Sequence, residues 1–148
     1  MLRGQDDLDS LWGVWENMEL HDTVRAEVLG PIFKKFLYTQ PDSAFSIASM
    51  QLVLAEKLAH QKLIAQAQIN QGRARLHQSR FKEAMEYFQL GLATARVVRF
   101  ASGEASALNN MGIVLESTGD YARSIDHYMQ SLKIREEEGN KQGGLPVA

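Results

Sequence analysis

Apolar side chains recur along the chain at intervals of three and four residues, the spacing that places them on one face of an α-helix. At the start of the chain, Leu8, Leu11, Trp12 and Trp15 form one such stripe. The pattern predicts seven helices and no sheet. The expected helices cover residues 6–18, 22–38, 41–58, 61–78, 81–98, 102–118 and 121–137.

Glycine and proline mark the ends and interruptions of these helices. Gly119 can adopt the left-handed conformation that ends a helix, and Asp120 can cap the helix that follows. Pro41 suits the first turn of a helix, where its fixed φ is favourable. Pro31 lies inside the second expected helix, where proline costs ~3 kcal/mol. We therefore expect a kink or a break at Pro31, with the helix continuing over residues 32–38.

The pattern of small and large side chains repeats with a period of 40 residues. Gly112 and Tyr128 correspond to Gly72 and Phe88 in the preceding unit. A fixed period of this length indicates a stack of helical hairpins. The glycines would lie where two helices approach closely, and an aromatic ring, Tyr128 or Tyr121 in the last unit, would fill the space. The two tryptophans near the start favour a capping helix for the stack over a binding surface.

The motifs of the last unit resemble the tetratricopeptide repeat. They are N-x-G at residues 110–112, G-D-Y at residues 119–121, and the small residue Ser124 followed by Tyr128. The period exceeds the ~34 residues usual for that repeat. It is similar to a longer-helix variant, in which the turn E-x-G-[ND]-K-x-G (Glu137–Gly143) joins successive units. The resemblance covers residues 22–143 and implies an all-α, right-handed solenoid of about three helix pairs plus an N-terminal helix.

The repeat assignment makes the chain one domain over residues 1–148. Its expected parts are an N-terminal helix (6–18), a degenerate first repeat (22–60), a second repeat (61–100), a third repeat (101–140), and a tail or start of a further repeat (141–148). The first repeat lacks the motif glycine, so its packing is the least defined by the pattern.

Composition narrows the class of function. The net charge of −2 argues against a dedicated nucleic-acid or membrane-surface binder. The chain has no cysteine, and therefore no disulfide framework. No apolar run reaches the length of a membrane span, and the N-terminus does not resemble a signal peptide. We expect a cytoplasmic protein as written, or a periplasmic one if the chain is excised from a membrane-bound sensor.

No constellation of catalytic or metal-binding residues stands out. His21, His60, His77 and His127 form no pair four residues apart, and the chain contains no H-E-x-x-H motif and no P-loop. Of the functions considered, a metal-dependent hydrolase has the least support in the sequence. We expect a protein that is not an enzyme and binds no cofactor.

The resemblance instead implies a binding groove along the first helix of each pair. The groove residues it implies are Gln66, Ile69, Asn70, Arg73 and His77 from the second unit and Ser106, Asn109, Asn110, Ile113 and Glu116 from the third. Asn70 and Asn110 carry the motif asparagine that often binds a peptide backbone in this family. They could equally solvate the groove or bond to a neighbouring helix. Gln66 and Ser106 stand where some members carry the basic residues of a carboxylate clamp, so such a clamp is not expected.

These features predict a non-catalytic protein-interaction module with a protein or peptide partner. The leading helix, the P-D-S-A start at residues 41–44 and the long repeats resemble the N-terminal input region of bacterial histidine kinases and nucleotide cyclases, which implies a sensor or dimerisation segment. The alternative is a free-standing adaptor that holds a peptide or partner helix. Apolar residues of the last helix, Ile125, Met129, Leu132 and Ile134, predict self-association or docking of residues 145–148 over them.

Overall fold

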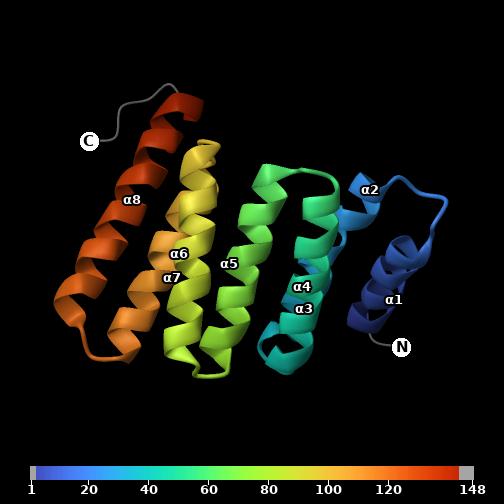
Figure 1. Cartoon of the computed structure of the whole chain (residues 1–148), viewed down its shortest axis with the longest axis horizontal. Helices are drawn as coiled ribbons and strands as arrows, with labels where there is room; N and C mark the ends of the chain where they lie inside the picture. The colour runs from blue at the N-terminus through green and yellow to red at the C-terminus, as the bar shows by residue number, and fades with distance from the viewer. Residues whose placement is uncertain (1–2, 144–148) are drawn as a thin grey trace.

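The computed structural model describes residues 3–143, which form a row of helices laid side by side (Figure 1). The described residues contain no strand. They form eight α-helices: α1 (Arg3–Glu16), α2 (Asp22–Glu27), α3 (Leu29–Leu37), α4 (Pro41–Lys57), α5 (Gln61–His77), α6 (Phe81–Val97), α7 (Ala101–Ser117) and α8 (Tyr121–Gly143). From α3 onward, each helix packs against the next one in the sequence. The all-α class and the pairing of successive helices are therefore confirmed. The tail residues 145–148 lie outside the described part.

The expected helix over residues 22–38 is two helices. α2 ends at Glu27 and α3 begins at Leu29, so the helix is interrupted at Val28. Pro31 has no N–H to donate to the carbonyl of Glu27, and its ring would clash with that carbonyl in a continuous helix. The break places Pro31 in the first turn of α3, where the N–H has no intrahelical partner to lose. The predicted break is confirmed, but helix resumes three residues earlier than expected.

The last helix is longer than expected. The segment Glu137–Gly143, predicted as a turn between repeats, continues α8 to its end. Lys141 Nζ lies 3.2 Å from Glu138 Oε1, an ion pair one helical turn apart. Gly139 lies inside the helix, where glycine costs about 1 kcal/mol relative to alanine. The segment contains no proline, so this modest cost does not stop the helix, and the turn prediction is wrong.

Two clusters of buried side chains hold the helices together. The first joins α3, α4 and α5 around Phe33, and the second joins α5, α6 and α7 around Phe88. Each of these rings is fully buried, which stabilises the fold by about 2–3 kcal/mol per side chain. The stripe of α1 packs against the first cluster through Leu8, Leu11, Trp12 and Trp15. The N-terminal helix therefore covers the first end of the array, as a capping helix does.

Glycine permits the closest helix contacts in the second and third units. A Cβ atom built on Gly72 would lie 2.6 Å from the ring of Phe88, and one built on Gly112 would lie 2.7 Å from the ring of Tyr128. Tyr121 is exposed, so Tyr128 is the ring that fills the space in the last unit. The same contact between a glycine and an aromatic ring therefore occurs in two successive units, 40 residues apart in the sequence.

Candidate functional site

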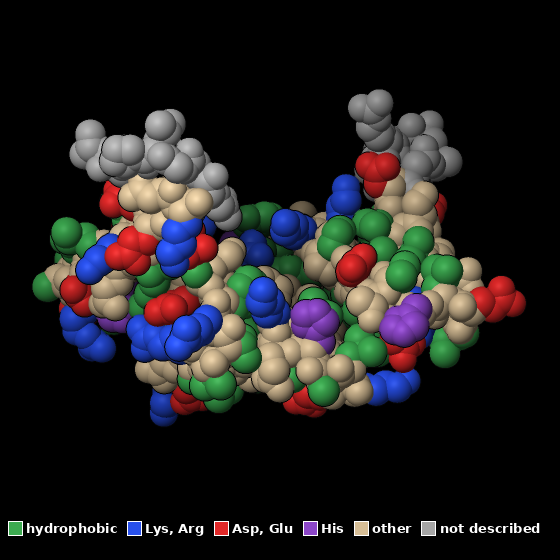
Figure 2. Space-filling view, turned by 90° about the horizontal axis from the view of Figure 1, so that it is seen from above, with side chains coloured by type: hydrophobic (Ala, Val, Ile, Leu, Met, Phe, Trp, Pro, Cys, Tyr) green, Lys and Arg blue, Asp and Glu red, His purple; other side chains and the backbone are tan. Residues whose placement is uncertain are grey.

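The first helices of three successive pairs, α3, α5 and α7, line one cavity of about 860 Å³. The space-filling view shows the array hollowed on one side between its two ends (Figure 2). The lining residues are Lys34 and Tyr38 from α3, Arg73, Leu76 and His77 from α5, Ser106, Asn109, Asn110, Ile113 and Ser117 from α7, and Ser79 and Phe81 where α5 leads into α6. A volume of this size can hold a short stretch of a bound chain.

Most of the groove residues expected from the sequence meet at this cavity. The members that line it are Arg73, His77, Ser106, Asn109, Asn110 and Ile113. They lie together because α5 packs against α7 as well as against its own partner α6. The repeat spacing predicts only that these residues lie on two separate helices. The packing of those two helices against each other brings the residues into one surface.

Two expected groove residues of α5 point into the interior instead. Ile69 is fully buried in the second cluster, so it does not frame the cavity. Asn70 is 2% exposed, and its Nδ2 donates to Gln51 Oε1 on α4 at 3.0 Å. Gln66 Nε2 donates to Asn70 Oδ1 at 3.3 Å. The Asn70 amide is therefore used inside the protein, in the structural role that the sequence left open.

Asn110 has a different environment from Asn70 although the two occupy the same place in the repeat. It is partly exposed at the cavity, and its Nδ2 donates to the Ser106 carbonyl of its own helix at 2.8 Å. The counterpart of Gln51 that would bury Asn110, forty residues later in the sequence, is Gly91. Asn110 therefore lines the cavity, whereas Asn70 is buried.

Glu116, the remaining expected residue of α7, interacts with α8. Tyr128 Oη donates to Glu116 Oε2 at 2.7 Å. Burial raises the pKa of the Tyr128 phenol, and the bond to the Glu116 carboxylate raises it further. Glu116 thus ties the last two helices together and does not line the cavity.

The sequence did not predict the contribution of α3. Lys34 and Tyr38 line the cavity, and the Tyr38 ring meets the His77 ring edge-on with 4.8 Å between centroids. Subtracting one repeat period from Arg73 and His77 leads to Phe33 and Leu37, which are buried. The first repeat lacks the motif glycine, so the repeat pattern did not predict that the adjacent residues, Lys34 and Tyr38, line the cavity.

The cavity is electropositive. Lys34 and Arg73 bring permanent charges, and none of the described side chains that line it is acidic. The Arg73 guanidinium lies 5.4 Å from the centroid of the Phe33 ring, and its Nη1 donates to Asn70 Oδ1 at 3.4 Å. Desolvation, and then the charge of Arg73, lower the pKa of His77 below its ordinary value of 6.5. His77 is therefore neutral near pH 7 and gains a proton more readily when an anion is near.

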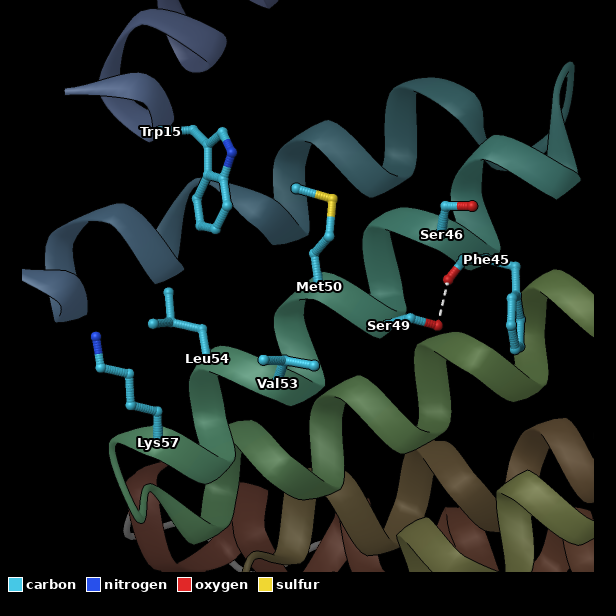
Figure 3. A pocket seen from close by; sticks show the side chains of 8 residues that line it. All are labelled: Trp15, Phe45, Ser46, Ser49, Met50, Val53, Leu54 and Lys57. Atoms are coloured by element: carbon cyan, nitrogen blue, oxygen red, sulfur yellow. Dashed lines mark hydrogen bonds between the residues drawn. The ribbon is translucent and has the colours of Figure 1, made fainter. Parts of the chain in front are cut away.

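A second pocket, of about 510 Å³, lies between α1 and α4 and shares no residue with the cavity (Figure 3). It is lined by Trp15 of α1 and by Phe45, Ser46, Ser49, Met50, Val53, Leu54 and Lys57 of α4. The serine hydroxyls and the lysine ammonium that line it have partners within the protein. Ser49 Oγ donates to the Phe45 carbonyl at 2.9 Å, and Lys57 Nζ lies 3.0 Å from Asp22 Oδ2. The pocket is therefore a mostly apolar surface whose serine and lysine side chains already have partners.

Residues 3–143 contain no group of three or more His, Asp or Glu side chains placed to hold a metal ion. None of the described helices is long and apolar enough to cross a membrane.

Paired helices stacked in sequence order around a shared concave cavity define an α-solenoid of helical hairpins. A family model of the tetratricopeptide repeat matches residues 63–137, just over half of the chain. The protein belongs to the tetratricopeptide repeat family, whose members serve as protein-interaction modules with protein or peptide partners. A search of curated proteins found no match to the chain.

Proposed function

We propose that the cavity between α3, α5 and α7 binds an extended segment of a partner protein that carries an acidic side chain. The charge of the lining supports this proposal. Lys34 and Arg73 are cationic, and no acidic side chain lines the described cavity, although the whole chain has a net charge of −2. Residues 61–100, the central repeat, hold seven Lys or Arg and two Asp or Glu. Like charges along a hollow raise the local concentration of an opposite charge.

Amide groups beside the cations would position the backbone of the bound segment. Asn109 and Asn110 are partly exposed on adjacent positions of α7. An amide can accept from a peptide N–H and donate to a peptide carbonyl. The proposal therefore retains Asn110 as a binding residue and assigns Asn70 to the interior.

The wider role we propose is that of a sensor or dimerisation input segment in a bacterial signalling protein. It is supported by the resemblance of the leading helix, the P-D-S-A start and the long repeats to such regions. A free-standing adaptor remains the alternative. Sequencing the gene on both sides of this region separates them, because an input segment requires a downstream kinase or cyclase domain in the same reading frame.

An array of twelve-residue peptides tests the proposal at the cavity. Each Glu-containing peptide is paired with a copy in which Gln replaces Glu. We expect the purified protein to bind Glu peptides more tightly than their Gln copies. Lys34→Gln should weaken that binding about two- to fivefold, the effect of one solvent-screened charge pair.

Lys35→Gln is the matched control, because Lys35 is exposed, adjacent in sequence and outside the cavity. It should leave the affinity unchanged. Equal binding of Glu and Gln peptides would refute the acidic preference and leave peptide binding intact. A failure of every peptide to bind at millimolar concentration would refute the cavity as a peptide site.

A further inference from the structure

The free face of α8 carries a stripe of exposed apolar side chains. Tyr121, Ile125, Met129 and Leu132 are between 56% and 65% exposed, and they follow one another at intervals of four, four and three residues. This spacing places them on one side of the helix. Another side of the helix, about 100° away around its axis, faces α7 through the buried residues Ser124 and Ser131. An apolar stripe of this kind is typical of a helix that packs against another helix.

The charges beside this stripe have a definite order. Asp126 and Lys133 are both exposed and, with Met129, line a shallow hollow of about 370 Å³ on α8. They lie seven residues apart, and their midpoint falls between Met129 and Gln130. Seven residues make almost two turns, so the two charges lie on the same flank of the stripe, about 10 Å apart along the axis.

This order is self-complementary for antiparallel helices. A two-fold axis through the midpoint places Asp126 of one copy opposite Lys133 of the other, and the same pair forms a second time by symmetry. Met129 then meets its own counterpart at the centre, with Ile125 of one copy beside Leu132 of the other. A parallel two-fold pairing would instead place the two copies of this flank on opposite sides of the contact, so that Asp126 and Lys133 would not pair with each other. Opposite charges therefore stabilise the antiparallel arrangement only.

We propose that a second copy of this chain covers the apolar stripe of α8, in an antiparallel, two-fold symmetric pair of α8 helices centred on Met129. The interface uses none of the residues that line the cavity. Dimerisation therefore leaves the cavity of each copy open. The test of the dimer is independent of the test of the proposed peptide binding.

Sedimentation equilibrium of the whole chain tests whether the dimer forms. The wild type should be dimeric at micromolar concentration, and Met129→Lys should raise the dimer dissociation constant at least a hundredfold, because it places two like charges at the centre of the interface. Val97→Lys is the control, since Val97 is 83% exposed on α6, and it should leave the dimer unchanged. A wild type that stays monomeric up to millimolar concentration would overturn the proposal.

Charge reversal tests the antiparallel register. Asp126→Lys and Lys133→Asp should each weaken the dimer about tenfold, because each creates two like-charge pairs. The double variant should restore the wild-type dissociation constant, because every pair is opposite in sign again. Circular dichroism checks that all variants remain folded. A double variant as weak as the two single variants would overturn the register.

Single cysteines give a second, covalent readout, since the natural chain has none. Met129→Cys should form a disulfide-linked dimer under mild oxidation. Glu136→Cys should not, because the two-fold axis separates residue 136 of the two copies by about 20 Å along the helices. Efficient cross-linking of both variants would indicate a parallel or unspecific contact and overturn the proposal.

Discussion

At the scale of single residues, two glycines determine how closely the helices of a pair approach. A side chain on Gly112 would collide with the ring of Tyr128. We expect Gly112→Leu to destabilise the protein by ~1–3 kcal/mol or more, through overpacking. Urea unfolding followed by circular dichroism measures this. Gly139→Ala is the control, because its Cβ would meet no atom within 4 Å. That variant should keep or slightly raise stability, since alanine favours helix.

The two motif asparagines should differ in their contributions to stability. Asn70→Ala leaves Gln51, which is 3% exposed, without its amide partner, and an unsatisfied buried polar group costs ~1–3 kcal/mol. Asn110→Ala removes a bond within one helix at a partly exposed site, so its effect should stay within about 0.5 kcal/mol. Thermal melts of the two variants measure the difference. Equal melting temperatures would show that Asn70 is not the structural member of the pair.

His77 should report on an anion in the cavity. Its pKa is lowered by desolvation and by Arg73, so the folded state favours the neutral ring. The stability this contributes is complete above the ordinary value of 6.5, and it is lost as pH falls from 6.5 through the lower pKa of the folded state. A titration followed by the NMR signals of the ring should give a midpoint below 6.5.

A bound carboxylate should move that midpoint upward, because an opposite charge favours the protonated ring. By linkage, the affinity for a Glu peptide should rise as pH falls through the His77 titration. The matching Gln peptide supplies the control and should leave the midpoint in place. An unchanged midpoint in the presence of saturating Glu peptide would mean that the carboxylate binds elsewhere.

At the scale of elements, hydroxyl groups attach α8 to α7. Ser124 Oγ donates to the Gly112 carbonyl at 2.8 Å, and Ser131 Oγ donates to the Ala105 carbonyl at 2.7 Å, both in buried positions. We expect Ser124→Ala with Ser131→Ala to cost about 1–3 kcal/mol in total. Amide exchange should then become faster in α8 before it changes in α5. Gln130→Ala, on the exposed side of α8, should change neither quantity.

At the scale of the whole molecule, stability should be graded along the array. Each helix contacts few others, and α5 packs against α3, α4, α6 and α7, whereas α8 packs against α7 alone. In an array of this kind, stability is approximately a sum over neighbouring units. Native-state amide exchange should therefore be slowest in α5 and fastest at α1 and α8. Uniform protection across all helices would indicate one cooperative unit instead.

The sequence by itself determined the helices, their pairing and the positions of the packing glycines. Apolar spacing fixes which face of each helix is buried, and Gly72 and Gly112 recur because one contact is built twice. Local chemistry also predicted the break before Pro31. The predicted turn at Glu137–Gly143 was wrong, because a single glycine without proline weakens a helix but does not end it.

Only the tertiary structure decided which polar residues are free to bind. Asn70 and Asn110 have the same place in the repeat, but the partner of Asn70 is Gln51, a residue of the preceding unit, and the equivalent position for Asn110 is a glycine. Lys34 and Tyr38 join Arg73 and His77 because α3 packs against α5. The spacing of residues within one helix fixes the direction of a side chain, whereas burial and charge depend on the neighbouring helices, which are far away in the sequence.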